Sequence, residues 1–237
     1  MKTYSVFWTG GFDSTYRVAE ILAKGLGIVR PLYILDPDRR SFPLELAAIS
    51  RLRVMLIRRF DCKTSLMPAE VYLKDDFPVK DKIASACADI RKSVHIGSQY
   101  EWLAQFCDET AGRFGKIELC AERYNPPVGW YARVFDDPYI FPPALKDYSA
   151  ECMFGHYSFP ILHLTTKEME LNAKKMGFYE ILQSTWFCHW PAGGRPCGAC
   201  YPCQLVKAGR NYAGYAFMGR ERKLISSACR KIKKLLR

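Results

Sequence analysis

The chain has 237 residues, of which 49% are hydrophobic and 14% aromatic, and its formal net charge is +11. This length and apolar content predict a sizeable buried core, built as one large domain or as one domain with a small appendage. No apolar run is long enough to span a bilayer, and the first residues contain no apolar segment with a small-residue cleavage site. A membrane-spanning class is therefore excluded, and we expect a cytoplasmic protein.

The positive charge is concentrated at one end of the chain. Residues 219–237 carry eight Lys or Arg residues and one Glu, a net charge of +7, which leaves +4 for the rest. Six apolar residues of this tail fall near one helical face: Leu224, Ile225, Ala228, Ile232, Leu235 and Leu236. The pattern predicts a terminal helix that docks its apolar stripe and leaves its lysines in water. Binding of RNA or of a protein partner is the sharper alternative for this segment.

The first quarter of the chain predicts alternating strands and helices. Strands are expected over residues 3–9 and 28–35, and helices over residues 13–24 and 44–53. Pro31 indicates that the second strand begins after Ile28, because proline removes a ladder hydrogen bond. This β-α-β-α order predicts a Rossmann-like α/β fold, with a mostly parallel sheet flanked by helices.

The later segments alternate between regular and irregular patterns. Residues 61–79 look like a long loop or an insertion, followed by helical patterns over 80–92 and 99–112 and a strand over 116–122. Residues 124–148 contain five prolines and many aromatics, which favours a lid over a substrate rather than a regular element. Residues 159–178 predict a short strand and then a helix that begins with a capping box, Thr165 and Glu168, and ends at Gly177.

The first strand leads into a glycine turn, in the sequence FWTGGFDSTYR over residues 7–17. Glycines let a ligand approach the backbone, and the N-terminus of the following helix offers unpaired N–H groups to an anion. A tight turn capped by Asp13 is the simpler interpretation of a double glycine. The candidate nucleotide-binding residues are Trp8, Thr9, Gly10, Gly11, Phe12, Asp13, Ser14, Thr15, Tyr16 and Arg17.

This turn closely resembles the Ser-Gly-Gly-x-Asp-Ser signature of the PP-loop pyrophosphatases, with Thr9 in place of the first serine. Members of that superfamily cleave ATP between its α and β phosphates and adenylate a substrate. The resemblance implies ATP and Mg²⁺ as cofactors, with Asp13 and Ser14 in catalysis. Asp13 would help to hold Mg²⁺ or cap the helix.

Four of the ten cysteines form one cluster, Cys188, Cys197, Cys200 and Cys203, whereas the other six are scattered singly. Four thiols within sixteen residues are typical of a closed, tetrahedral Zn²⁺ site. An iron–sulfur cluster is the chemical rival, because the sequence does not fix the metal.

The glycine turn combined with this cysteine pattern resembles the 7-cyano-7-deazaguanine synthases of the queuosine pathway. Residues 160–165 and the pair Thr185–Trp186 are also similar to that family. The family uses ATP and ammonia to convert 7-carboxy-7-deazaguanine into an amide and then a nitrile, and its four cysteines bind zinc. The resemblance implies an ATP-dependent carbon–nitrogen ligase with an ATP-binding α/β domain over residues 1–184. Residues 185–237 would form a zinc knuckle and a basic helix packed on that domain.

The middle of the chain departs from the family pattern. Residues 36–40 stand where the family has an Asp-Tyr-Gly-Gln-Arg-like stretch, and Gly97-Ser98-Gln99 stands where it has Gly-Arg-Asn. The candidate substrate residues are Asp36, Arg40, His163 and Lys167.

Two alternatives to an ammonia-dependent synthase stay open. Diverged relatives in bacterial antiphage operons are thought to attach a deazaguanine to a protein amine, so the acceptor is either ammonia or a protein amine. An alternative of another class is an inactive PP-loop fold that serves as an RNA-binding or scaffold module. The sequence also leaves open a homodimer, and it leaves open whether AMP and pyrophosphate or ADP and phosphate are the products.

Overall fold

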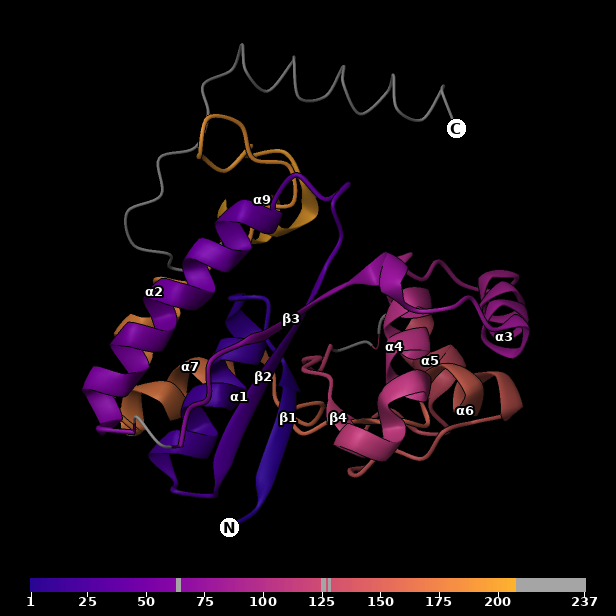
Figure 1. Cartoon of the computed structure of the whole chain (residues 1–237), viewed down its shortest axis with the longest axis horizontal. Helices are drawn as coiled ribbons and strands as arrows, with labels where there is room; N and C mark the ends of the chain where they lie inside the picture. Colours follow the sequence, from indigo (N-terminus) through magenta and orange to yellow (C-terminus); the bar gives the residue numbers. More distant parts are fainter. Residues whose placement is uncertain (63–64, 125–126, 128, 208–237) are drawn as a thin grey trace.

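The chain folds around one five-stranded sheet, in a computed structural model that describes residues 1–62, 65–124, 127 and 129–207. All strand pairs are parallel, in the order β3-β2-β1-β4-β5 (Figure 1). The strands are β1 (Thr3–Phe7), β2 (Ile28–Leu35), β3 (Glu70–Leu73), β4 (Ile117–Glu118) and β5 (Tyr157–Ser158). The predicted α/β class with a parallel sheet is confirmed.

Helices cover both faces of the sheet, as Figure 1 shows. One face packs against α1 (Phe12–Ala23), α2 (Phe42–Phe60), α7 (Thr166–Lys175) and α8 (Tyr179–Leu182). The other face packs against α3 (Asp81–Arg91), α4 (Gln99–Phe114), α5 (Gly129–Val134) and α6 (Tyr148–Phe154). Each face therefore has its own apolar cluster, and the central strands contribute side chains to both.

The short helix α9 (Tyr201–Lys207) begins directly after Cys200 and contains Cys203, the last of the four clustered cysteines. Trp186, Phe187 and the four clustered cysteines belong to the same apolar cluster as α1 and α2. The described part of the cysteine segment is thus packed directly onto the α/β core.

Strand β2 includes Pro31, although we expected the strand to begin later. Val29 bonds with Ser65 and Met67 on the β3 side, so the next rung would join the residue-31 N–H to the Met67 carbonyl. Proline has no N–H to give, and Arg53 Nε instead lies 3.4 Å from the Met67 oxygen. The strand continues because the missing rung falls in a gap of the ladder, between the bridge to Leu66 and the start of β3.

Two helices illustrate which sequence signals decide the local structure. The capping box of α7 is present, with the Thr165 side chain accepting from the Glu168 N–H and the Glu168 carboxylate accepting from the Thr165 N–H. Helix α2 is longer than the predicted 44–53. It has Pro43 in its first turn and ends at Phe60, followed by the C-cap Asp61, whose φ is 46°.

Three segments differ from the secondary structure that the sequence predicts. Residues 61–79 are not only a loop, because they contain β3 and a short 3₁₀ turn at Lys74–Asp76. Residues 124–148 contain α5. The predicted strand over 116–122 is reduced to the two residues of β4, since the chain leaves the sheet there to line a cavity.

The strand order reverses direction at β1. The chain adds β2 and β3 on one side of β1, and later adds β4 and β5 on the other. In open parallel sheets, the two connections that leave such neighbouring strands diverge and form a crevice at the carboxyl ends. Here that point lies between the ends of β1 and β4, after Phe7 and Glu118.

Within the described residues, no helix is long and apolar enough to cross a membrane. The predicted basic helix near the C-terminus falls in residues 208–237, outside the described residues.

Candidate functional site

A cavity of about 570 Å³ opens where β1 and β4 diverge. Thr9 and Gly11, which follow β1, lie on one wall, and Cys120 and Glu122, which follow β4, lie on another. Its volume falls in the range of small-molecule sites, roughly 300 to 1,000 Å³. The fold therefore places the candidate site where parallel α/β sheets usually bind ligands.

Gly10 and Gly11 of the turn are glycines for different structural reasons. Gly10 has φ +70°, and a Cβ there would lie 3.0 Å from Ala48 Cβ and 3.2 Å from the Glu45 carbonyl oxygen. Gly10 therefore lets the turn pack closely on α2. Gly11 has φ −80°, lines the cavity, and would place a Cβ 3.2 Å from Thr9 Oγ1. Only the second glycine faces the candidate ligand.

Helix α1 begins at this turn and points its N-terminus at the cavity. Gly11 is the N-cap and supplies no side-chain hydrogen bond, and Phe12, Asp13 and Ser14 of the first turn all line the cavity. The first N–H groups of a helix have no intrahelical acceptor, and they carry the positive end of the helix dipole. This turn can therefore bind an anion through its backbone.

The remaining residues of the predicted nucleotide motif support the turn from behind. Trp8, Thr15 and Tyr16 are fully buried, and the Trp8 indole N–H donates to Thr15 Oγ1 at 2.9 Å. That hydroxyl is therefore held inside the core and does not line the cavity. Burial and the charge of Glu20 raise the pKa of Tyr16, so its hydroxyl stays protonated at neutral pH.

Arg17 forms a structural ion pair instead of lining the cavity. Its guanidinium donates two hydrogen bonds to Glu118, both at 2.8 Å, and a third to Glu20. Burial alone would lower the pKa of Arg17, but the hydrogen bonds and charges of Glu118 and Glu20 together outweigh it and raise that pKa. Arg17 thus fastens α1 to β4.

The predicted substrate residues lie away from the cavity. Asp36 pairs with Lys74 at 2.6 Å, and exposed Arg40 stacks its guanidinium over Trp190, 5.9 Å from the ring centroid. His163 and Lys167 are exposed, and the His163 ring packs against Phe141. The structure brings Arg39, the neighbour of Arg40, to the cavity instead.

An aromatic wall faces the glycine turn across the cavity. It consists of side chains from α4 and α5 and from the segment between β4 and α5, namely Tyr100, Trp102, Tyr124, Trp130 and Tyr131. Trp130 contacts the Tyr100 ring at 5.1 Å and stacks on Phe154. The Tyr131 hydroxyl donates to the Glu122 carbonyl at 2.8 Å. Such a wall suits a flat ring that is bound by stacking.

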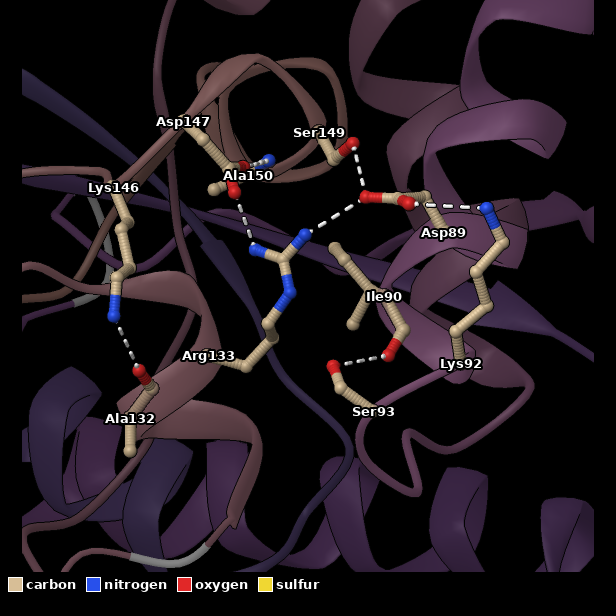
Figure 2. Close-up of polar contacts among 10 residues, drawn as sticks. All are labelled: Asp89, Ile90, Lys92, Ser93, Ala132, Arg133, Lys146, Asp147, Ser149 and Ala150. Atoms are coloured by element: carbon tan, nitrogen blue, oxygen red, sulfur yellow. Dashed lines mark hydrogen bonds and ion pairs between the residues drawn. The ribbon is translucent and has the colours of Figure 1, made fainter.

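Helix α5, which carries Trp130, is tied to the neighbouring helices by Arg133. Figure 2 shows the Arg133 guanidinium between Asp89 of α3 and Asp147, the N-cap of α6. The two bonds measure 2.8 and 2.6 Å, and Ser149 also donates to Asp89. The aromatic wall is therefore fixed by a polar network on its outer side.

Cys120 lines the cavity but is not prepared as a nucleophile. Burial and the nearby Glu118 carboxylate raise the pKa of its thiol well above the usual value. A neutral thiol is a weak nucleophile, so Cys120 contributes shape rather than covalent chemistry.

The four clustered cysteines form a compact, buried set of sulfurs. All four Sγ atoms lie within 4.8 Å of one another, with 3.8 Å between Cys197 and Cys203 and 4.0 Å between Cys188 and Cys200. Four thiolates around Zn²⁺, with Zn–S bonds of about 2.3 Å, give sulfur separations of roughly 3.8 Å. The donor set therefore fits a tetrahedral metal ion such as zinc.

Backbone N–H groups support the same interpretation of the cluster. The N–H of Cys197 points at Cys188 Sγ, and the N–H groups of Ala199 and Cys200 point at Cys197 Sγ. Such donors stabilise thiolate charge in metal sites. The hydrogen bond with Cys188 lowers the pKa of Cys200, the direction that favours a thiolate.

The cysteine segment also builds one side of the candidate site. The backbone N–H of Trp186 donates to the Gly10 carbonyl at 2.8 Å, and His189 and Tyr201 line the cavity. A smaller depression beside it joins Gly11, Asp13 and Arg39 to Trp186 and Pro202. The cysteine segment and the glycine turn are thus in direct contact.

No protein-family model matches the chain, and no curated protein sequence matches it.

Proposed function

We propose that the chain is an ATP-dependent carbon–nitrogen ligase that adenylates the carboxylate of a 7-carboxy-7-deazaguanine-type substrate and transfers the acyl group to ammonia. One observation carries the proposal. A glycine turn of the PP-loop pattern opens, with the N-terminus of α1, into a cavity at the point where β1 and β4 diverge.

The phosphate groups of ATP would lie at the glycine turn. Gly11 leaves room for them, and the N–H groups of the first turn of α1 supply fixed donors. The Ser14 hydroxyl lies at the same wall. Preorganised donors are what this chemistry requires, because phosphoryl transfer needs charge stabilisation more than it needs a protein nucleophile.

Two carboxylates provide the complementary chemistry. Asp13 and Glu122 line the cavity, and carboxylate oxygens are ligands that Mg²⁺ prefers. A bound Mg²⁺ would neutralise phosphate charge. Asp13 and Glu122 would hold it, and the Thr166 hydroxyl orients the Glu122 carboxylate by donating to it.

The aromatic wall supports a flat heterocyclic substrate. Tyr100 and Trp130 offer ring surface, and burial raises the pKa of Tyr100 to about 12, so that its hydroxyl remains a donor at neutral pH. A deazaguanine ring has both an aromatic face and polar edges, and stacking is tolerant of such rings.

The reaction then proceeds in two displacements. A substrate carboxylate oxygen attacks the α-phosphorus, and pyrophosphate leaves with the cleaved bond's electron pair. Ammonia next attacks the acyl carbon of the mixed anhydride, loses a proton, and expels AMP. The cysteine cluster contributes by fixing the wall that bonds to Gly10.

Mass spectrometry of the products tests this function directly. The protein is incubated with ATP, Mg²⁺, 7-carboxy-7-deazaguanine and ammonium, and we expect the amide or the nitrile together with AMP. Asp13→Asn should form less product while remaining folded. A mass shift on a protein lysine, without small-molecule amide, would contradict ammonia as the acceptor. The absence of any ATP turnover would contradict the ligase function and favour a binding module.

A further inference from the structure

Arg39 differs from every other basic residue that the structure describes near the site. Among the described residues, it is the one Lys or Arg that lines the cavity, and it also lines the smaller depression beside the glycine turn. The cavity walls also carry the carboxylates of Asp13, Glu45 and Glu122. A polyanionic ligand in such surroundings needs a fixed cation, and this residue supplies it.

The Arg39 guanidinium is held by a buried carboxylate. Glu45 is only 4% exposed and accepts from the Tyr33 hydroxyl at 2.8 Å and from the Ser41 hydroxyl at 2.6 Å. Its Oε1 also lies 3.0 Å from Arg39 Nε. Burial and the Glu45 charge raise the pKa of Tyr33, so its hydroxyl remains a donor to that carboxylate.

Glu45 engages the Arg39 guanidinium through Nε, and the two Nη atoms have other surroundings. Arg39 Nε also contacts Ser41, and Nη1 donates to Gln99 at 3.3 Å. Within the part of the chain that the structure describes, Nη2 makes no hydrogen bond. An arginine anchored through Nε, with Nη2 left to donate, suits a charge-assisted hydrogen bond to a phosphate group.

The residues that line the smaller depression indicate which part of ATP would contact Arg39. Its walls include Gly11 and Asp13 from the start of α1, together with Arg39 and His189. A phosphate chain bound at the N–H groups of α1 would extend into this space, whereas a flat ring would face the aromatic wall of the larger cavity.

We propose that Arg39 binds the β- and γ-phosphates of ATP, the pair that leaves as pyrophosphate. The inference deepens the proposed function and rests on it. The proposal assigns different roles to two neighbouring arginines, because exposed Arg40 stacks on Trp190 and lines neither the cavity nor the smaller depression. The distinction cannot be made from the sequence, where both residues follow the same strand.

Calorimetric titration of the full chain with magnesium pyrophosphate and, separately, with AMP tests the assignment. We expect Arg39→Met to weaken pyrophosphate binding by about tenfold or more, as loss of a charge-assisted hydrogen bond does. AMP binding should change by less than about threefold, because AMP lacks the groups that Arg39 would meet. Arg40→Met is the matched control and should bind both ligands as the wild type does.

A second variant is needed to distinguish weaker binding from loss of folding, because Arg39→Met leaves the Glu45 carboxylate buried without its cation. Arg39→Lys keeps the charge but loses the planar fork, so it should melt close to the wild type and still bind pyrophosphate more weakly. Folded Arg39→Met or Arg39→Lys protein with wild-type affinity for pyrophosphate overturns the inference. If wild-type protein binds neither ATP nor pyrophosphate, the proposed function itself fails.

Discussion

Gly10 and Gly11 are adjacent in the chain but make separate contributions to the candidate site. The fold requires a glycine at position 10, because its φ is +70° and an added Cβ would lie too close to α2. Gly11 has an ordinary φ of −80°, and the nearest obstacle to a Cβ is the Thr9 side chain. A paired substitution can therefore separate folding from ligand binding.

We expect Gly11→Ala to fold and to bind ATP more weakly. The added methyl group enters the wall where phosphates would approach the backbone, and crowding of about 1 to 3 kcal/mol corresponds to roughly 5- to 150-fold in affinity. Calorimetric titration with ATP and a thermal melt of the same sample measure the two effects. Gly10→Ala, the control, should instead lower the melting temperature, because positive φ alone costs about 1 to 2 kcal/mol. ATP affinity equal to wild type in Gly11→Ala would show that this glycine serves only the turn.

At the scale of elements, the Asp108 carboxylate contributes two ion pairs to the contact of α4 with the start of α3. Asp108 on α4 accepts from Lys80 at 2.7 Å and from Lys82 at 2.6 Å. Burial acts to raise the pKa of Asp108, but the two lysines outweigh it and lower that pKa to about 2. A carboxyl group whose pKa is lower in the folded state stabilises the fold above its unfolded pKa, and this contribution is lost as the pH falls towards 2.

We therefore expect Asp108→Asn to lower the free energy of unfolding by about 1 kcal/mol at pH 7, a value reduced for the solvent exposure of the lysines. Urea unfolding of both proteins measures this difference, and it should narrow when the pH is lowered from 7 to 3. An equal difference at both pH values would mean that the charge of Asp108 does not stabilise this contact.

The elements that the sequence predicted well have strong local signals. Strand β1 alternates, α1 has a clear apolar face, and α7 has both halves of its capping box. Strand β3 and helix α5 have four and six residues, too few for periodicity to show. Their structure is decided by what they pack against, which the sequence does not display.

The side chains of the candidate site could likewise be predicted only where they lie close together in the sequence. The glycine turn and the cysteines could be found because their residues lie close together in the chain. Arg39, Tyr100, Glu122 and Trp130 come from separate segments and meet only when β1 and β4 become neighbours. The choice between Arg39 and Arg40 depends on how the chain turns between β2 and α2, a turn for which the sequence has no signal.

For the whole molecule, the candidate metal site at the four cysteines and the candidate nucleotide site should be coupled. The Trp186–Gly10 hydrogen bond joins them, and residues around the cysteines line the cavity. Elemental analysis of anaerobically purified protein should find about one zinc per chain, and Cys203→Ser should lose zinc, melt at a lower temperature and bind ATP more weakly. Cys152→Ser, outside the cluster, is the control and should change none of these. Iron with sulfide in the wild type, or an unchanged melting temperature after metal loss, would contradict a structural zinc.

In the proposed function, a substrate carboxylate attacks the α-phosphorus of ATP at the glycine turn. Transfer of ¹⁸O from a doubly labelled carboxylate substrate, followed by mass spectrometry of the released nucleotide, tests it most directly. In the proposed reaction one labelled oxygen stays with the α-phosphorus when ammonia displaces AMP, so AMP should be heavier by one ¹⁸O and pyrophosphate should be unlabelled. Label in inorganic phosphate together with ADP, or AMP without label, would mean that the carboxylate does not attack the α-phosphorus.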